Sequence, residues 1–244
     1  MEKAVEYRKA IIENMKEAVE EIITYNQRVK GRSKIKHEYI VADLAKCGEH
    51  YKDSRIRLMV IGRAAGKISV EPEKWLSDVG SGSLEYYFDL AQKDQLEWLA
   101  SRGKKGEKRI GKKPFYKLVG DIVNELLPEE TKGEDGFGWV PYIARTNFYN
   151  ITYFNSDSNP NKALIQAQHS AMLKILECDL NYFDPTHILI ITNSNWPDEQ
   201  KFQDFMNIIR SRKGDCKIAV TERPEFKSCK IVQENMKKIW EQFQ

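Results

Sequence analysis

The chain lacks several features that would assign a protein to a class at once. Its 244 residues contain no uninterrupted apolar run of about 18 residues, so we expect no membrane-spanning helix. The first ten residues, MEKAVEYRKA, are charged and hold no apolar core, so we also expect no secretory signal. Internal repeats and low-complexity segments are absent as well. These absences predict a cytoplasmic protein with no membrane partner.

Cysteine is scarce and scattered. The residues form no CxxC pair, and the chain holds only Cys47, Cys178, Cys216 and Cys229. This spacing matches neither a zinc signature nor the disulfide framework of a small secreted domain. We therefore expect reduced thiols, no metal site and no cofactor.

Apolar and charged residues, by contrast, are both plentiful. Hydrophobic residues make up 41% of the chain and charged residues 31%, and the mean hydropathy is -0.60. A length of 244 residues fits one domain with a sizeable core, so we predict a single domain over residues 1–244. The net charge of +3 is mildly basic and is only a weak indication of a nucleic-acid partner.

The basic residues are more informative in their distribution than in their number. The segment from Arg102 to Lys113 holds seven basic residues against one acid, with three glycines between them. Such a segment is typical of a flexible cationic loop that follows a phosphate backbone. The residues predicted to contact DNA are Lys104, Lys105, Lys108 and Arg109. The alternative is a solvated loop with no partner.

Strand-like and helix-like segments alternate along the chain. Apolar runs predict strands over 57–61, 142–147, 187–192 and 217–220. Apolar stripes predict the following helices over 114–126, 160–176, 198–209 and 230–243. The alternation predicts a three-layer α/β/α fold with a central four-stranded parallel sheet. A long amphipathic helix over 2–29 is additional, and residues 1–54, with a short helix near 40–45, form a helical extension packed on the core.

The most informative stretch is RLMVIGRAAG, residues 57–66. A buried strand here runs straight into a turn bracketed by Gly62 and Gly66, which brings bare backbone to the carboxyl edge of the sheet. Ligands of open α/β sheets bind at that edge. We therefore predict that Gly62, Arg63, Ala65 and Gly66 line a ligand site, although the two glycines also suit close packing of strand against helix.

The residues that follow the strands are rich in amides, aromatic rings and arginine, with no histidine or cysteine. Asn147 ends the second strand, Asn193 follows the third and Arg223 follows the fourth. An amide presents a donor and an acceptor in one plane, and a ring offers a stacking face. Together they suit a planar heterocycle with amide edges, so we predict a nucleobase as ligand.

The order of these segments resembles the uracil-DNA glycosylase superfamily over residues 55–226. The turn at 61–66 resembles the first motif of that family, which approaches the base and its sugar. The segment Pro114-Phe115-Tyr116 resembles the aromatic segment that stacks on an extruded base, and Asn147 resembles the asparagine that reads the base edge. Residues 221–226 fall where the family has its final loop, which enters the minor groove.

The resemblance implies hydrolysis of the N-glycosidic bond of a damaged base in DNA, without a metal. The final loop departs from the family pattern, because TERPEF holds no histidine before its proline. Arg223 is then the residue expected to stabilise negative charge on the departing base. The first motif also lacks a nearby Asp or Asn to orient water, and Glu71 is the closest downstream acid.

Two other functions stay open at this point. The first is a catalytically inactive protein of the same fold that binds a nucleobase or nucleic acid, which the missing histidine favours. The second is a flavodoxin-like nucleotide- or phosphate-binding protein, which the absence of a P-loop lysine and serine arrangement disfavours. The two rings at 115 and 116 also suit the core, and Asn147 also suits a cap of the next turn.

Overall fold

The computed structural model describes residues 2–29, 39–41, 44–64, 114–132, 138–153, 162–192, 198–211, 216–224 and 229–244. Its helices are α1 (Glu2–Arg28), α5 (Pro114–Leu126), the 3-10 turn η2 (Val140–Tyr142), α6 (Lys162–Phe183), α7 (Glu199–Ser211) and α8 (Cys229–Phe243). Its strands are β1 (Tyr39–Val41), β2 (Lys46–Cys47), β3 (Leu58–Ala64), β4 (Ile143–Tyr149), β5 (Ile151–Tyr153), β6 (His187–Thr192) and β7 (Lys217–Glu222).

The four expected parallel strands are confirmed as β3, β4, β6 and β7. They form a sheet of order β2-β4-β3-β6-β7, in which β4, β3, β6 and β7 run parallel. The sequence did not predict β2, a two-residue edge strand that pairs antiparallel with β4, or the separate antiparallel pair of β1 and β5. The sheet therefore has five strands where four were expected.

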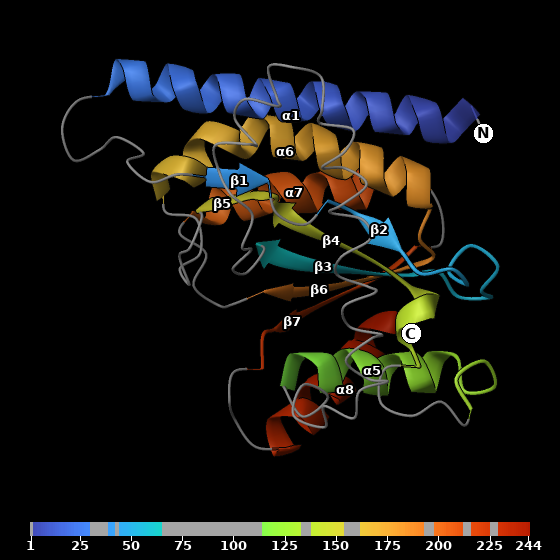
Figure 1. Ribbon diagram of the computed structural model, residues 1–244. Helices are drawn as coiled ribbons and strands as arrows, with labels where there is room; N and C mark the ends of the chain where they lie inside the picture. Colours follow the sequence, from blue (N-terminus) through green and yellow to red (C-terminus); the bar gives the residue numbers. More distant parts are fainter. Residues whose placement is uncertain are drawn as a thin grey trace.

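Side chains of the central strands alternate between two cores, one on each face of the sheet. Met59, Ile61 and Ile190 pack with α1, α6 and α7, whereas Val60 and Leu189 pack with α5 and α8. Figure 1 shows the resulting layers, with α1, α6 and α7 above the sheet and α5 and α8 below it. The three-layer α/β/α fold predicted from the sequence is confirmed.

The N-terminal segment is only partly the helical extension that the sequence predicts. Helix α1 buries the expected stripe of Tyr7, Ile11, Met15 and Ile22 and packs along α6. The short helix predicted near 40–45 is wrong, because Tyr39–Val41 is a strand and residues 44–45 are irregular. A short apolar run fits a strand as well as a helix, and here pairing with β5 decides.

Helix α6 holds the first residue of β5 and the middle of β4 with side chains rather than with backbone. Gln168 accepts a hydrogen bond from the Ile151 N–H (3.1 Å) and donates one to the Ile151 carbonyl (2.9 Å), as a neighbouring strand would. Asp179 accepts hydrogen bonds from the hydroxyls of Thr146 (2.9 Å) and Tyr7 (2.8 Å). Asp179 therefore ties α1, α6 and β4 together.

The structure also bears on membrane spans and disulfides, neither of which the sequence predicts. No helix in the described ranges is long and apolar enough to cross a membrane. Three of the cysteines, Cys47, Cys178 and Cys216, carry free thiols.

Replacing Gly48 with alanine is expected to destabilise the fold by about 3 kcal/mol, the upper end for overpacking. A Cβ at Gly48 would overlap the backbone carbonyl of Pro141, and backbone yields less easily than a side chain. At this size the melting temperature should fall by about 6–12 °C. Thermal unfolding followed by circular dichroism measures it.

The matched control is Glu49→Ala, at a neighbouring side chain that is 77% exposed. It should change the free energy of unfolding by less than about 0.5 kcal/mol. Equal melting temperatures for Gly48→Ala and the unsubstituted protein would contradict the close approach of β2 to Pro141.

Candidate functional site at the carboxyl edge of the sheet

The strand order places a topological switch point between β3 and β6. The chain leaves β3 for β4 on one side and leaves β6 for β7 on the other side, so the two connections diverge. In open α/β sheets, such a divergence opens a crevice outside the carboxyl ends of the strands. Strand β3 continues to Ala64 and β4 to Tyr149, so Gly62, Arg63 and Asn147 lie in the last residues of these strands. The turn predicted to begin at Gly62 is therefore wrong, because the pairing with β4 extends the strand to Ala64. Arg223 directly follows β7 at the same end of the sheet.

Gly62 and Asn147 face each other across the β3–β4 pair. They are direct partners in the parallel register, and the Asn147 side chain is buried, with 4% of its surface exposed. A Cβ on Gly62 would overlap the Asn147 Oδ1 and lie 3.5 Å from its Cγ. The Asn147 amide therefore packs directly over the Gly62 Cα, and glycine is required there for that position.

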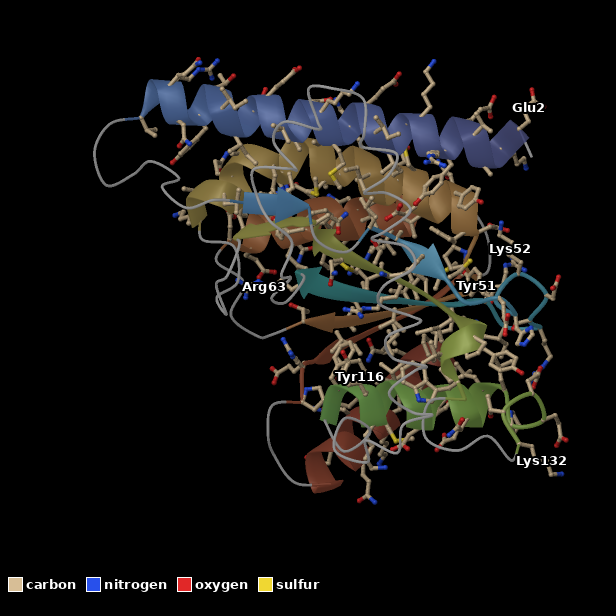
Figure 2. The ribbon with its side chains drawn as sticks, viewed as in Figure 1. Glu2, Tyr51, Lys52, Arg63, Tyr116 and Lys132 are labelled. Carbon is tan, nitrogen blue, oxygen red and sulfur yellow. The ribbon has the colours of Figure 1, made fainter. Side chains whose placement is uncertain are left out.

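The start of α5 brings two aromatic rings to the same end of the sheet. Phe115 and Tyr116 are perpendicular, with ring centroids 5.3 Å apart, and both pack at the margin of the α5–α8 core. Figure 2 shows Tyr116 at the start of α5 and Arg63 at the end of β3, near one end of the molecule. Each ring is half-buried and so keeps some exposed surface.

The exit of β7 is held against the exit of β6 and brings a cation to Phe115. The Arg223 N–H donates a hydrogen bond to the Thr192 carbonyl at 2.7 Å. The Arg223 guanidinium lies 6.0 Å from the centre of the Phe115 ring, at the outer limit for a cation–π contact. Of the predicted site residues, Gly62 and Asn147 thus form one contact, and Phe115, Tyr116 and Arg223 form another.

Arg63 belongs to a different group of side chains. It is half-buried beside Tyr149, and burial lowers its pKa, although a guanidinium remains charged at neutral pH. Tyr149 lies in the core between the sheet and α6, which is the face opposite to α5 and α8. The structure therefore separates Arg63 from Phe115 and Arg223 by the thickness of the sheet.

The remaining predicted site residues lie outside the described ranges. They are Ala65, Gly66, Glu71, Asn193, Lys104, Lys105, Lys108 and Arg109. Their assignments stay predictions.

A hydrogen-bonded chain that sequence reasoning missed joins β4, α6 and α7. The Tyr149 hydroxyl lies 3.2 Å from His169 Nδ1, and His169 Nε2 lies 3.1 Å from Asp204 Oδ2. The three residues come from three elements, so no local motif reveals them. The one sequence signal is that His169 lies at helical spacing between the buried Ile165 and Met172 of α6.

Burial and hydrogen bonds set the protonation states of Tyr149, His169 and Asp204. It raises the pKa of Tyr149 and lowers that of His169, although the hydrogen bond to Asp204 partly opposes the shift at the histidine. Hydrogen bonds from Gln200 and His169 lower the pKa of Asp204. At neutral pH the chain therefore holds a phenol, a neutral imidazole and a carboxylate.

Metal-binding groups and surface hollows also bear on the chemistry of the site. Within the ranges that the structure describes, no group of three or more His, Cys, Asp or Glu side chains could hold a metal ion. A hollow of about 480 Å³ lies between α5 and α8, lined by residues that include Glu125 and Trp240. Because Glu125 lies at the opposite end of α5 from Phe115, this hollow is separate from the predicted site.

No protein-family model matches the chain, and no curated protein matches its sequence.

Proposed function

We propose that the protein binds a nucleobase of DNA at the carboxyl edge of β3, β4 and β7 and hydrolyses its N-glycosidic bond. One observation carries the proposal: the buried Asn147 amide lies over Gly62, beside the switch point of the sheet. A buried amide whose position depends on a glycine is a fixed donor and acceptor, which is the group that reads the edge of a base.

The aromatic and cationic side chains complete this assignment. Phe115 offers the exposed part of its ring for stacking on an extruded base. Arg223, at 6.0 Å from that ring, is a cation close to where a stacked base would depart. Hydrolysis breaks the bond between C1′ and the base nitrogen, water adds its oxygen to C1′, and the base leaves with a proton from water. Arg223 stabilises the negative charge that develops on the base.

Two parts of the proposal concern residues outside the described ranges. Glu71 orients the attacking water, and the basic segment with Lys104, Lys105, Lys108 and Arg109 contacts the phosphates. Neither part depends on a metal or a cofactor.

A second function, base binding without cleavage, has one specific feature in its favour. The exit of β7 reads Thr221-Glu222-Arg223-Pro224 and holds no histidine, and Glu222 is exposed beside Arg223. An exposed carboxylate repels phosphates, which disfavours entry of this loop into a DNA groove.

Base release from oligonucleotides that carry uracil, hypoxanthine or xanthine tests the proposed function, in single and double strands. The unsubstituted protein should release at least one of these bases, and Arg223→Gln should reduce the rate about 100-fold, as loss of one charge-stabilising group does. The control Arg210→Gln, at an exposed position in the last turn of α7, should keep the full rate.

Failure to release any base at high protein concentration would overturn the hydrolytic part. Binding of the same oligonucleotides, titrated at several salt concentrations, then decides between the two functions. Binding that weakens steeply with salt supports a phosphate-contacting base binder, and no binding at any salt concentration overturns both.

A further inference from the structure

The last residues of β4 pair with β3 on one side and contact side chains of α6. On the inner side, Asn147 and Tyr149 pair with Gly62 and Ala64 of β3. On the outer side, β2 pairs only with Ala144 and Arg145. Pairing with β2 therefore ends two residues before Asn147, and side chains of α6 contact β4 beyond that point.

Helix α6 supplies those side chains to each side of Asn147. Before it, Asp179 binds the Thr146 hydroxyl (2.9 Å). After it, His169 binds the Tyr149 hydroxyl (3.2 Å). These two contacts flank the proposed base-reading residue in the sequence of β4.

The contact through His169 continues to the molecular surface. Tyr149 is fully buried, the His169 side chain is 12% exposed and the Asp204 side chain is 32% exposed. A carboxylate only accepts hydrogen bonds. A neutral His169 therefore carries its proton on Nε2, and the Nε2–H donates a hydrogen bond to Asp204. His169 Nδ1 is then an acceptor, and the Tyr149 hydroxyl donates to it.

Packing fixes the geometry of this chain. The Phe205 ring lies edge-on to His169, with centroids 5.2 Å apart, and edge-on to Tyr149, with centroids 5.4 Å apart. Two more charged groups lie near these side chains at the start of α7, where Lys201 forms an ion pair of 3.2 Å with Asp198, the residue before the helix. The contacts with Phe205 hold the rings of Tyr149 and His169 in their orientations.

We infer that Tyr149 and His169 are positioning residues for Asn147. The chain to Asp204 fixes the end of β4 against α6, and this fixes the Asn147 amide two residues earlier on the same strand. The inference rests on the proposed function for the role of Asn147 as base reader, but the mechanical coupling itself is independent of any ligand.

The coupling is tested without nucleic acid, by the side-chain amide resonances of Asn147 in the ¹⁵N-labelled protein. Tyr149→Phe removes one hydroxyl and keeps the ring, and it should shift both Asn147 amide resonances. The matched control is Tyr142→Phe, which removes a hydroxyl that donates to the Glu130 carbonyl (2.9 Å) just before the other end of β4. The control should leave the Asn147 resonances in place.

Affinity for a base-carrying oligonucleotide gives a second readout. Tyr149→Phe and His169→Ala should weaken binding by about tenfold, as expected for one buried hydrogen bond. His169→Gln keeps one acceptor and one donor and should recover most of the affinity. Tyr142→Phe should bind as the unsubstituted protein does.

The two readouts separate the inference from the proposed function. If no oligonucleotide binds, the proposed function fails and the Asn147 resonances alone decide the coupling. Asn147 resonances that move no more in Tyr149→Phe than in Tyr142→Phe would overturn the inference. Equal affinity of Tyr149→Phe and the unsubstituted protein would overturn the positioning role as well.

Discussion

Replacing Gly62 with alanine is expected to abolish base recognition while the fold is retained. The added Cβ would overlap Asn147 Oδ1, so the amide must leave its position over β3. A base that loses a hydrogen-bond partner and leaves polar groups unpaired should bind about 100-fold more weakly. Equilibrium titration with a uracil-, hypoxanthine- or xanthine-containing oligonucleotide measures the loss, with circular dichroism to verify the fold.

A matched glycine lies on α5. A Cβ on Gly120 would lie 2.7 Å from Trp139 Nε1, so Gly120→Ala is similarly crowded but meets a tryptophan instead of Asn147. It should cost stability and leave the affinity unchanged. In addition, Gly62→Ala should cost nothing further in an Asn147→Ala background, because the two residues act through one contact. Additive effects of the two substitutions would contradict that contact.

Substituting Asp179 with asparagine should remove a large pH dependence of stability. Burial raises the pKa of Asp179 from 3.8 to about 7, against the opposing hydrogen bonds from Tyr7 and Thr146. Between these values the native state holds a proton that the unfolded chain has lost. The free energy of unfolding therefore falls by about 1.4 kcal/mol for each pH unit, or about 4 kcal/mol in total as pH rises from 4 to 7.

Urea unfolding at pH values from 4 to 8 measures this difference. The Asp179→Asn protein should gain stability relative to the unsubstituted protein as pH rises to about 7, and the difference should stay constant above that. The control is Asp121→Asn on α5, where the carboxylate is partly exposed and pairs with Lys117. The difference in free energy of unfolding between Asp121→Asn and the unsubstituted protein should change by no more than about 0.5 kcal/mol over this pH range. Parallel curves for Asp179→Asn and the unsubstituted protein would contradict a protonated Asp179.

The sequence predicts the main elements of the fold because apolar periodicity decides them. Three of the four parallel strands, β3, β6 and β7, carry short apolar runs, and the helices carry apolar stripes. The strand β2 has two residues, which is too short for a periodic pattern of apolar side chains to appear. Its antiparallel partners, Arg145 and Ala144, are far away in the sequence. The sequence also does not predict the strand at Tyr39–Val41, because that strand is short and depends on pairing with the distant β5.

The candidate site shows the same division between local and distant information. Gly62, Asn147 and Arg223 could be picked out because each lies at the end of a predicted strand or just after it. That Gly62 and Asn147 touch depends on the β3–β4 register, which is not readable from either segment alone. The position of Arg63 on the other face follows from strand alternation after the register is known.

The chain from Tyr149 through His169 to Asp204 could not be predicted in the same way. Its members are 20 and 35 residues apart and lie on a strand and two helices. Their contact depends on how α6 and α7 pack over β4.

The central claim is that Asn147 reads a base at the carboxyl edge of β3 and β4. It is tested most directly by adding oligonucleotides to the ¹⁵N-labelled protein and following the Asn147 side-chain amide resonances. A strand with uracil, hypoxanthine or xanthine should shift these resonances saturably, and an undamaged strand of the same sequence should not. Asn147 resonances that stay in place while a damaged strand binds, or that respond equally to both strands, would contradict the claim.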